Sequence, residues 1–324
     1  MFMSFMILSA LGITFNVMVL FSLVLALGMP VVIKPGREEP WTPLRIMQAF
    51  IAAGCPRAAF SFYPTDHEGS GVILERCERT LLFGDAAVTD AYKNDARVQL
   101  HGPGRSKVLI GKDEIENWRD HLPVLLASVA ANGGRSCVNA SSILVPSHGK
   151  EIATALAEDL ASHRPAKSDD ENATLSAFAN RNYAEFIDAK ITADIADGGA
   201  EDLTAKHREV PRTVEFDGAP YLLPTIIHCE HIDHPLAKTE FMFPFAAVVE
   251  VPHEELVAAM GPSLVVTAIT REPQLIGELT QSDHIDRLNL GPVPTSYVEW
   301  DQPHEGNLFE FLYERRAIQR ASNW

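Results

Sequence analysis

The sequence predicts an α/β protein that folds as two lobes. Short apolar runs of the kind that form buried strands alternate with longer segments whose apolar residues recur at helical spacing. This alternation is typical of helix-connected strands in a mainly parallel sheet. It occupies both halves of the chain, and a length of 324 residues is sufficient for two domains.

The expected elements follow from this alternation. In the first half we expect strands at 31–33, 59–63, 80–83 and 108–110, and helices at 43–53, 68–76 and 84–92. In the second half we expect helices at 115–131, 151–162 and 178–195, and strands at 143–145, 221–229, 246–251 and 264–270. Residues 163–182 are polar and rich in charge, so we expect a solvated connection without a chemical role.

The N-terminal segment allows more than one interpretation. Residues 1–33 contain no charged side chain, and residues 15–27 are almost wholly apolar. They are interpreted either as a buried helix followed by the strand at 31–33, or as a membrane anchor over residues 5–27. A secretory signal is less favoured, because no lysine or arginine precedes the apolar run. The strand leads directly into Lys34-Pro35-Gly36, which is unusual after an anchor, so we expect buried elements.

Composition narrows the class of protein. Hydrophobic residues make up 46% and charged residues 22% of the chain, which is ordinary for a soluble globular protein. The formal net charge of −16 argues against a nucleic-acid partner, because phosphate binding needs clustered lysine and arginine. Cys55, Cys77, Cys137 and Cys229 form no C-x-x-C pair, which argues against a disulfide framework or a zinc finger. We therefore expect a cytoplasmic protein without a metal site.

One cysteine lies in a segment with the features of an active-site loop. Cys137 follows Gly133 and Gly134 and lies between a helical run and the strand at 143–145. Backbone N–H groups at such a junction can stabilise a thiolate and an oxyanion, which favours a reactive nucleophile. The alternative is a buried, unreactive cysteine, which is a common use of this residue.

Six short motifs, taken in chain order, carry a resemblance to a known family. They are Val31-Val32-Ile33-Lys34-Pro35-Gly36 with Ala53-Gly54-Cys55-Pro56, Leu82-Phe83-Gly84-Asp85, His101-Gly102-Pro103-Gly104-Arg105-Ser106, Asn132-x-Gly134-Arg135-x-Cys137, Glu240-Phe241-Met242-Phe243-Pro244, and Leu290-Gly291-Pro292-Val293. This set resembles the aldehyde dehydrogenase superfamily over residues 28–318. Members of that family have a long section before the Lys-Pro turn, so the resemblance implies a divergent, N-terminally truncated member.

The resemblance implies an aldehyde-dehydrogenase-like α/β fold with three parts. Residues 1–107 would form an incomplete, Rossmann-type nucleotide-binding domain, and residues 108–296 a catalytic domain that contains the cysteine. Residues 297–324 would pack back on the nucleotide-binding domain. The family acts on small-molecule aldehydes with NAD or NADP and commonly assembles as homo-oligomers, so the resemblance implies these partners here.

The resemblance also implies roles for individual residues. Cys137 would be the nucleophile that attacks the aldehyde and carries first a thiohemiacetal and then a thioester. Lys34 would bind the adenosine ribose or a 2′-phosphate, and Gly84, in the place of the family's Phe-Thr-Gly-Ser turn, would line the cofactor site. Glu240 would accept hydrogen bonds from the nicotinamide ribose. A solvated lysine after a strand and an exposed glutamate are the structural alternatives.

Three departures from the family's pattern leave the reaction open. His101 stands where the family has a glutamate base, and histidine can act as that base or be structural. Arg135 replaces a glutamine; its charge would favour the thiolate, or it would bind an anionic substrate or a cofactor phosphate. The family's oxyanion asparagine would fall near Leu11, where the sequence has none. The alternatives to oxidation to a carboxylic acid are therefore acyl transfer to coenzyme A, acyl-thioester reduction, and a catalytically impaired or non-catalytic protein.

Overall fold

The computed structural model describes residues 5–8, 24–25, 27–167, 169–299, 306–313 and 316–322, with residues 5–8 and Ala86 described by backbone alone. The chain divides into two compact units. The first unit comprises residues 1–101 and 305–324, and the second unit comprises residues 102–304. The bounds expected from the sequence, 107/108 and 296/297, differ from these by several residues. In particular, β6 (Ser106–Ile110) lies wholly within the second unit.

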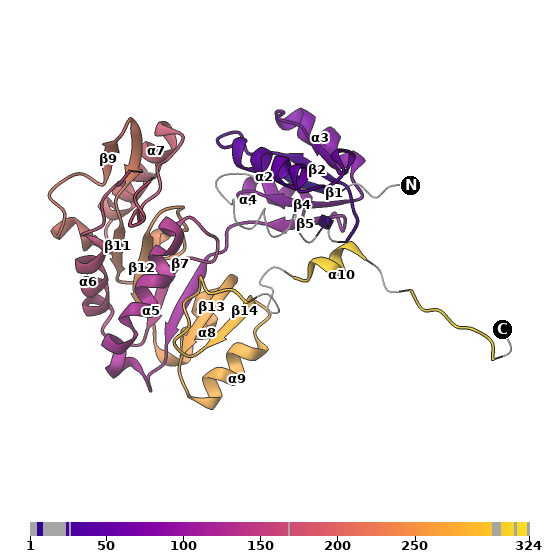
Figure 1. The fold of residues 1–324 in the computed structure, drawn as a ribbon. Coiled ribbons are helices and arrows are strands. Elements are labelled where there is room, and N and C mark those ends of the chain that lie inside the picture. Colours follow the sequence, from indigo (N-terminus) through magenta and orange to yellow (C-terminus); the bar gives the residue numbers. More distant parts are fainter. Residues whose placement is uncertain are drawn as a thin grey trace. The chain divides into compact units, whose positions relative to one another are not determined.

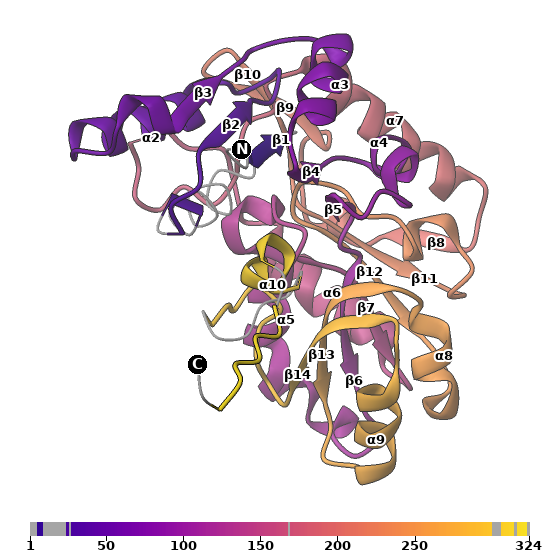
Figure 2. The same cartoon turned by 90° about the vertical axis from the view of Figure 1, so that its right-hand side faces the viewer.

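The first unit is built on a five-stranded parallel sheet in the order β3-β2-β1-β4-β5 (Figure 1; β3 is labelled in Figure 2). Its strands are β1 (Phe5–Leu8), β2 (Val31–Lys34), β3 (Phe60–Phe62), β4 (Arg79–Phe83) and β5 (Val98–His101). β1 pairs with β2 on one side and with β4 on the other. A central first strand with later strands added on both sides is the order of a doubly wound nucleotide-binding sheet.

Three expected strands of this sheet, those at 31–33, 59–63 and 80–83, are confirmed, whereas β1 and β5 were not expected. β1 lies in an uncharged run in which no alternation separates a strand from a helix. The helix considered over residues 15–27, and most of the anchor considered over 5–27, lie outside the described residues. The four residues of that stretch that form β1 are part of a sheet.

Helices cover both faces of the first sheet. They are α2 (Trp41–Ala52), α3 (His67–Arg76), α4 (Ala86–Thr89) and α10 (Leu308–Leu312). Leu81 shares a core with Met47 of α2 and Leu312 of α10, whereas its neighbour Leu82 shares a separate core with Leu74 of α3. Successive strand residues point to opposite faces, so an apolar run such as Leu81-Leu82-Phe83 is the pattern of a strand that is buried on both sides.

The second unit is built on a seven-stranded sheet in the order β14-β13-β6-β7-β12-β11-β8 (Figure 2). Besides β6, its strands are β7 (Ala140–Val145), β8 (Ala200–Asp202), β11 (Thr225–Cys229), β12 (Phe245–Glu250), β13 (Ser263–Ile269) and β14 (Ile285–Leu290). All neighbouring pairs are parallel except β11 with β8. Parallel strands joined by helices confirm the predicted α/β class in this half of the chain.

One expected strand of the second unit is wrong in its extent. Residues 221–229 do not form a single strand: β10 (Ala219–Leu222) pairs with β9 (Thr213–Phe216) in a hairpin, and β11 begins at Thr225. Pro224 lies between them, and proline cannot donate the backbone hydrogen bond that a central strand requires.

The faces of the second sheet are also covered by helices. They are α5 (Trp118–Ala130), α6 (Gly149–Leu160), α7 (Arg181–Ala196), α8 (Leu256–Met260) and α9 (Pro273–Gln281). Val108 and Ile143 belong to a core with α5 and α6. Their neighbours Leu109 and Leu144 belong to the opposite core, with α7, α8 and α9. The result is three layers, with the sheet in the middle.

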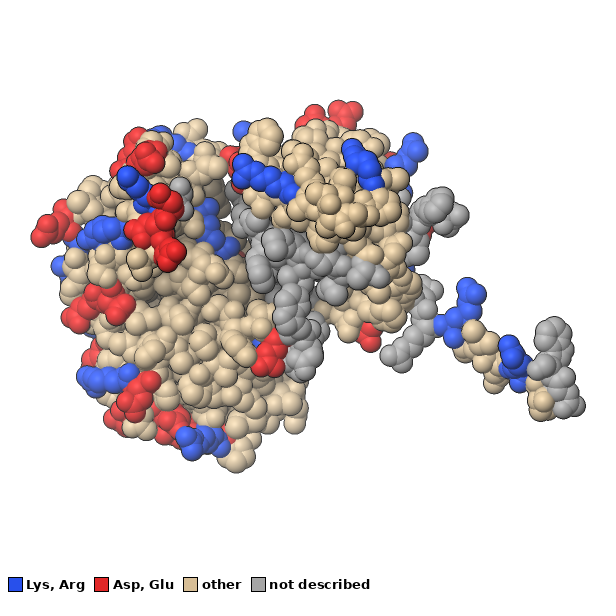
Figure 3. All heavy atoms as spheres, in the orientation of Figure 1, with Lys and Arg blue, Asp and Glu red and all other residues tan. Residues whose placement is uncertain are grey.

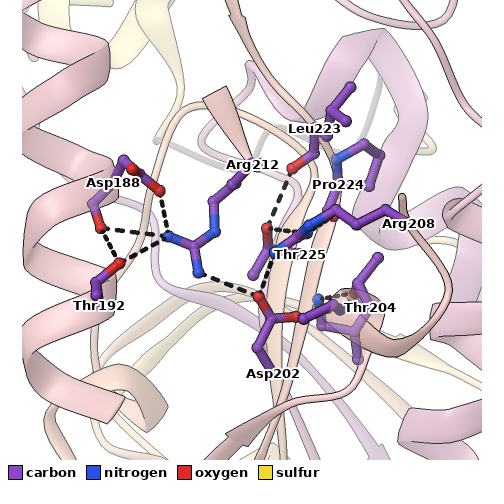
Figure 4. Close-up of polar contacts among 11 residues, drawn as sticks. Asp188, Thr192, Asp202, Thr204, Arg208, Arg212, Leu223, Pro224 and Thr225 are labelled. Carbon is purple, nitrogen blue, oxygen red and sulfur yellow. Dashed lines mark hydrogen bonds and ion pairs between the residues drawn. The ribbon is translucent and has the colours of Figure 1, made fainter. Parts of the chain in front are cut away.

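A buried ionic network ties α7 to the edge of this sheet (Figure 4). The Asp202 carboxylate accepts hydrogen bonds from Arg208 Nη2 at 2.5 Å and from Arg212 Nη2 at 3.1 Å. Arg212 Nη1 donates to the Asp188 carboxylate of α7 at 2.5 Å. The side chains of Arg208, Arg212 and Asp202 are 6%, 7% and 8% exposed, so each depends on the others for its charge to be compensated.

The described surface carries charged side chains of both signs (Figure 3). On the face drawn in Figure 3, lysine and arginine are scattered among aspartate and glutamate without a continuous basic patch on the described surface. Among the described residues, no helix combines the length and the apolar character needed to cross a bilayer.

Candidate active site

The cysteine loop connects α5 to β7 and is fixed by its own polar contacts. A short 3₁₀ turn (Ala131–Gly134) follows α5, and Cys137, 5% exposed, comes just before β7. Asn139 organises the loop: its Oδ1 accepts a hydrogen bond from the Ser136 N–H at 2.9 Å, and its Nδ2 donates to the carbonyls of Ser128 and Ala131 at 3.1 Å each. The backbone around the thiol is therefore held on both sides.

Gly134 is required by geometry. Its φ is 67°, and a Cβ at this position would lie 2.3 Å from the Pro244 nitrogen and 2.4 Å from the Phe243 carbonyl carbon. The cysteine loop thus packs directly on the backbone that follows Glu240. The cysteine motif and the Glu240 motif, more than one hundred residues apart in the chain, meet here because Gly134 has no side chain.

The turn that leads into β6 contacts the Cys137 backbone. The Ser106 hydroxyl donates a hydrogen bond to the Cys137 carbonyl oxygen at 2.8 Å. A Cβ at Gly104 would lie only 1.9 Å from the same oxygen, so the turn approaches as closely as a glycine permits. Arg105, between them, has a φ of 46°, which is uncommon for a residue other than glycine.

The same turn holds the Glu240 carboxylate. The Arg105 N–H donates a hydrogen bond to Glu240 Oε2, and the Gly104 N–H also donates to this carboxylate. Burial raises the pKa of Glu240 to about 6, although these two N–H groups and the charges of Arg105 and Lys107 act in the opposite direction. Segment 104–107 therefore joins the Cys137 carbonyl to the Glu240 carboxylate.

Lys107 secures this turn from the side of the sheet. Its Nζ donates to the Arg105 carbonyl at 2.7 Å and to the Ser263 hydroxyl at 2.9 Å. Burial lowers the pKa of Lys107 to about 8, the nearby Arg105 charge adds to this effect, and Glu240 opposes it. Lys107 and Ser263 were not expected from the sequence to have a role, although a lysine directly before the apolar run Val108-Leu109-Ile110 was a usable signal.

The segment before α7 corrects an expectation. Residues 163–182 were expected to be a solvated connection, but Leu175 and Phe178 are only 8% and 4% exposed. Arg135 Nη2 donates to the carbonyls of Ser176 and Ala177 at 3.2 and 2.7 Å. The expectation is wrong for this part of the connection. The twenty residues are polar on average, and this average hid the few apolar residues among them that are buried.

Lys34, Gly84 and His101 share the carboxyl edge of the first sheet. They end or follow β2, β4 and β5, whose strands are parallel. The Gly84 N–H donates to the His101 carbonyl at 3.1 Å, and the buried His101 ring stacks on Phe83 with centroids 4.3 Å apart. Burial lowers the pKa of Lys34, and Asp66 opposes this.

The predicted site residues thus form two groups. Cys137 and Glu240 are joined within the second unit, and Lys34, Gly84 and His101 lie together within the first. The region near Leu11, where the sequence lacks the oxyanion asparagine, lies outside the described residues. Asn139 and Ser106 stabilise the cysteine loop and were not singled out from the sequence, because asparagine and serine in a loop are common.

Comparison with known proteins identifies the family of the chain. A sequence model of the aldehyde dehydrogenase family matches residues 14–261, about three quarters of the chain. A protein assigned as an aldehyde dehydrogenase in Staphylococcus haemolyticus is 24% identical over 182 residues, which are 53% of this chain and 38% of that protein.

Solved structures agree in fold. The glyceraldehyde-3-phosphate dehydrogenase of Methanocaldococcus jannaschii, complexed with NADP, superposes with a TM-score of 0.76 at 14% identity, covering 91% of this chain and 65% of that one. An aldehyde dehydrogenase of Bacillus cereus in complex with NAD⁺ has a TM-score of 0.75 at 15% identity, covering 92% and 60%. The chain spans less than two thirds of the length of each of these three proteins. From the extent of the family match, the chain belongs to the aldehyde dehydrogenase family.

Proposed function

We propose that the chain catalyses the NAD(P)-dependent oxidation of an aldehyde to a carboxylic acid, with Cys137 as the nucleophile. The observation that carries this proposal is the turn at 104–107, which contacts the Cys137 carbonyl and holds the Glu240 carboxylate. One turn thus fixes the backbone of the proposed nucleophile and the carboxylate that would hold the nicotinamide ribose, which would keep the reacting groups in a defined orientation. Membership of the family supports the reaction class.

The residues of the chain fit a nicotinamide dinucleotide. Lys34 offers an ammonium group at the carboxyl edge of a parallel sheet, where such sheets bind nucleotides, and Gly84 follows a strand at the same edge. The Glu240 carboxylate has about four acceptor positions, of which the N–H groups of Gly104 and Arg105 occupy two, so acceptor capacity remains for ribose hydroxyls. NAD or NADP, when bound, supplies the hydride acceptor.

The chain's own residues account for the covalent steps. Cys137 Sγ attacks the carbonyl carbon to give a thiohemiacetal, and loss of hydride from that carbon leaves a thioester on Cys137. A base then removes a proton from water, which attacks the thioester and releases the carboxylic acid and the thiol. We assign the base role to His101. The Ser106 and Asn139 contacts keep the loop in one geometry while the acyl group is attached.

Activity assays and ligand-induced stabilisation test this proposal together. Purified protein is mixed with a panel of aldehydes and either NAD or NADP, and reduced nicotinamide is measured by its absorbance. Cys137→Ala should lower the rate by at least about 1,000-fold, because a missing nucleophile removes the covalent route. A cofactor that binds the native state should also raise the melting temperature. Undiminished oxidation by Cys137→Ala would contradict the proposal.

A further inference from the structure

Arg135 is a cation of the cysteine loop, and its contacts with the described residues are with uncharged groups. Its Nη2 donates to the carbonyls of Ser176 and Ala177, and its guanidinium carbon lies 4.2 Å from the centre of the Phe178 ring. Its Nε is buried and has no hydrogen-bond acceptor among the residues that the structure describes. Its Nη1 makes no hydrogen bond within the described part of the chain.

No carboxylate in that same part of the chain lies within ion-pair distance of this guanidinium. Burial lowers the pKa of Arg135 to about 10, and the groups that oppose this are Tyr183 and Tyr221. Neither of these two groups is a carboxylate. By contrast, the buried arginines Arg208 and Arg212 share the Asp202 carboxylate.

A partly buried cation without a counter-charge is costly, and an anion from outside the chain would remove that cost. Arginine suits this role, because its planar guanidinium matches the oxygens of a carboxylate or a phosphate. Arg135 precedes Cys137 by two positions, so their Cα atoms lie within about 7 Å of each other. An anion held by Arg135 would therefore be bound by the same loop that carries the thiol.

We propose that Arg135 determines substrate specificity by binding an anionic group of the aldehyde, and that the substrates are aldehydes bearing a carboxylate or a phosphate. This inference rests on the proposed function, because it assumes that the aldehyde reacts at Cys137. In this arrangement the charged end of the substrate pairs with the guanidinium while the carbonyl carbon faces the sulfur. The contacts of Arg135 with Ser176 and Ala177 keep the guanidinium in place for this role.

Matched substrate pairs test the specificity. We would compare 4-oxobutanoate with butanal, and glyceraldehyde 3-phosphate with glyceraldehyde, by kcat/KM. The wild-type enzyme should prefer the charged member of at least one pair by about tenfold or more. Which pair shows this preference tells whether the bound anion is a carboxylate or a phosphate. Arg135→Gln should reduce that preference to about twofold or less, whereas Arg135→Lys should retain part of it. An unchanged preference in Arg135→Gln, or none in the wild type, would overturn the proposal.

Alkylation of Cys137 tests the anion site without any turnover. Iodoacetate and iodoacetamide have nearly the same shape, but only iodoacetate is charged, so their rate ratio at Cys137 reports the local positive charge. A change in thiolate fraction alters both rates equally and leaves the ratio unchanged. We expect the ratio at Cys137, mapped by peptide mass, to exceed that of glutathione and to fall severalfold in Arg135→Gln.

The control is Arg164→Gln, because its sequence neighbours Ala161 and His163 supply carbonyl acceptors to Arg164 among the described residues, and Arg164 is exposed. This variant should leave the ratio at Cys137 unchanged. If the ratio behaves as expected but no aldehyde is oxidised, the proposed function fails and the anion site stands. If aldehydes are oxidised but the wild-type ratio does not exceed that of glutathione, the anion site fails and the proposed function stands.

Discussion

Substitution of alanine for Gly104 tests whether the close approach of the 104–107 turn to Cys137 shapes the site. The new Cβ would lie 1.9 Å from the Cys137 carbonyl oxygen and 2.7 Å from its carbon, so one backbone segment must move by about 1 Å. Overpacking of this kind costs about 1–3 kcal/mol, and loss of the buried Ser106 hydrogen bond adds about 1–3 kcal/mol. A net loss of about 3 kcal/mol lowers the melting temperature by roughly 6–12 °C for a unit of this size.

The matched control is Gly277→Ala, the same substitution in the interior of α9. A Cβ at Gly277 meets no atom within 4 Å, and alanine favours a helix over glycine by about 0.5–1 kcal/mol. This variant should therefore melt at a slightly higher temperature than the wild type. Scanning calorimetry measures the melting temperature of both variants, and the rate of Cys137 alkylation by iodoacetamide reports the accessibility of the thiol in the cysteine loop. If Gly104→Ala melts and reacts like the wild type, the described contact does not constrain the cysteine loop.

Three further predictions address the ionic network, a buried carboxyl and the proposed base. Asp202→Asn removes the carboxylate shared by two buried arginines and should cost about 3–5 kcal/mol in urea denaturation. Asp233→Asn, in an exposed pair, should cost far less, and equal effects of the two substitutions would refute the reasoning. The pKa of Glu240 is raised from 4.5 to about 6, so between these pH values the folded state keeps a proton that the unfolded chain releases. The free energy of unfolding should therefore fall by about 2 kcal/mol as the pH rises through this window. A Glu240→Gln variant that shows the same fall would exclude Glu240 as its origin. His101→Ala should leave acylation of the thiol intact but slow the release of the free acid. Single-turnover experiments with and without coenzyme A measure both steps. Unchanged hydrolysis would mean that another residue is the base, and release that occurs only with coenzyme A would indicate acyl transfer.

Much of the fold could be predicted from local patterns, because buried parallel strands leave a strong signal. The run Leu81-Leu82-Phe83 before a glycine and Val31-Val32-Ile33 before Lys-Pro-Gly have few alternative interpretations. β5 and β14 are weaker cases, since Val98-Gln99-Leu100-His101 is short and 285–290 mixes charged with apolar residues. Strand order, register and the position of β1 at the centre of its sheet depend on contacts that no local pattern encodes.

The site was predictable in its residue types but not in its connections. Cys137 and Glu240 stood out from their motifs, yet the turn that joins them acts through backbone N–H groups and the absence of a side chain at Gly104. Such contacts depend on the conformation of the backbone. A glycine allows that conformation but does not determine it. The partners of Arg135 lie about forty residues further along the chain, in a segment whose composition pointed to solvent.

The measurement that tests the central claim most directly is the mass of the protein during turnover. Protein, NAD or NADP and an excess of aldehyde are mixed, quenched in acid within one turnover, and digested for peptide mapping. We predict an acyl adduct on the peptide that contains Cys137, absent without cofactor and absent in Cys137→Ala. Oxidation of the aldehyde by Cys137→Ala at the wild-type rate, or an acyl adduct on a different residue, would contradict the account.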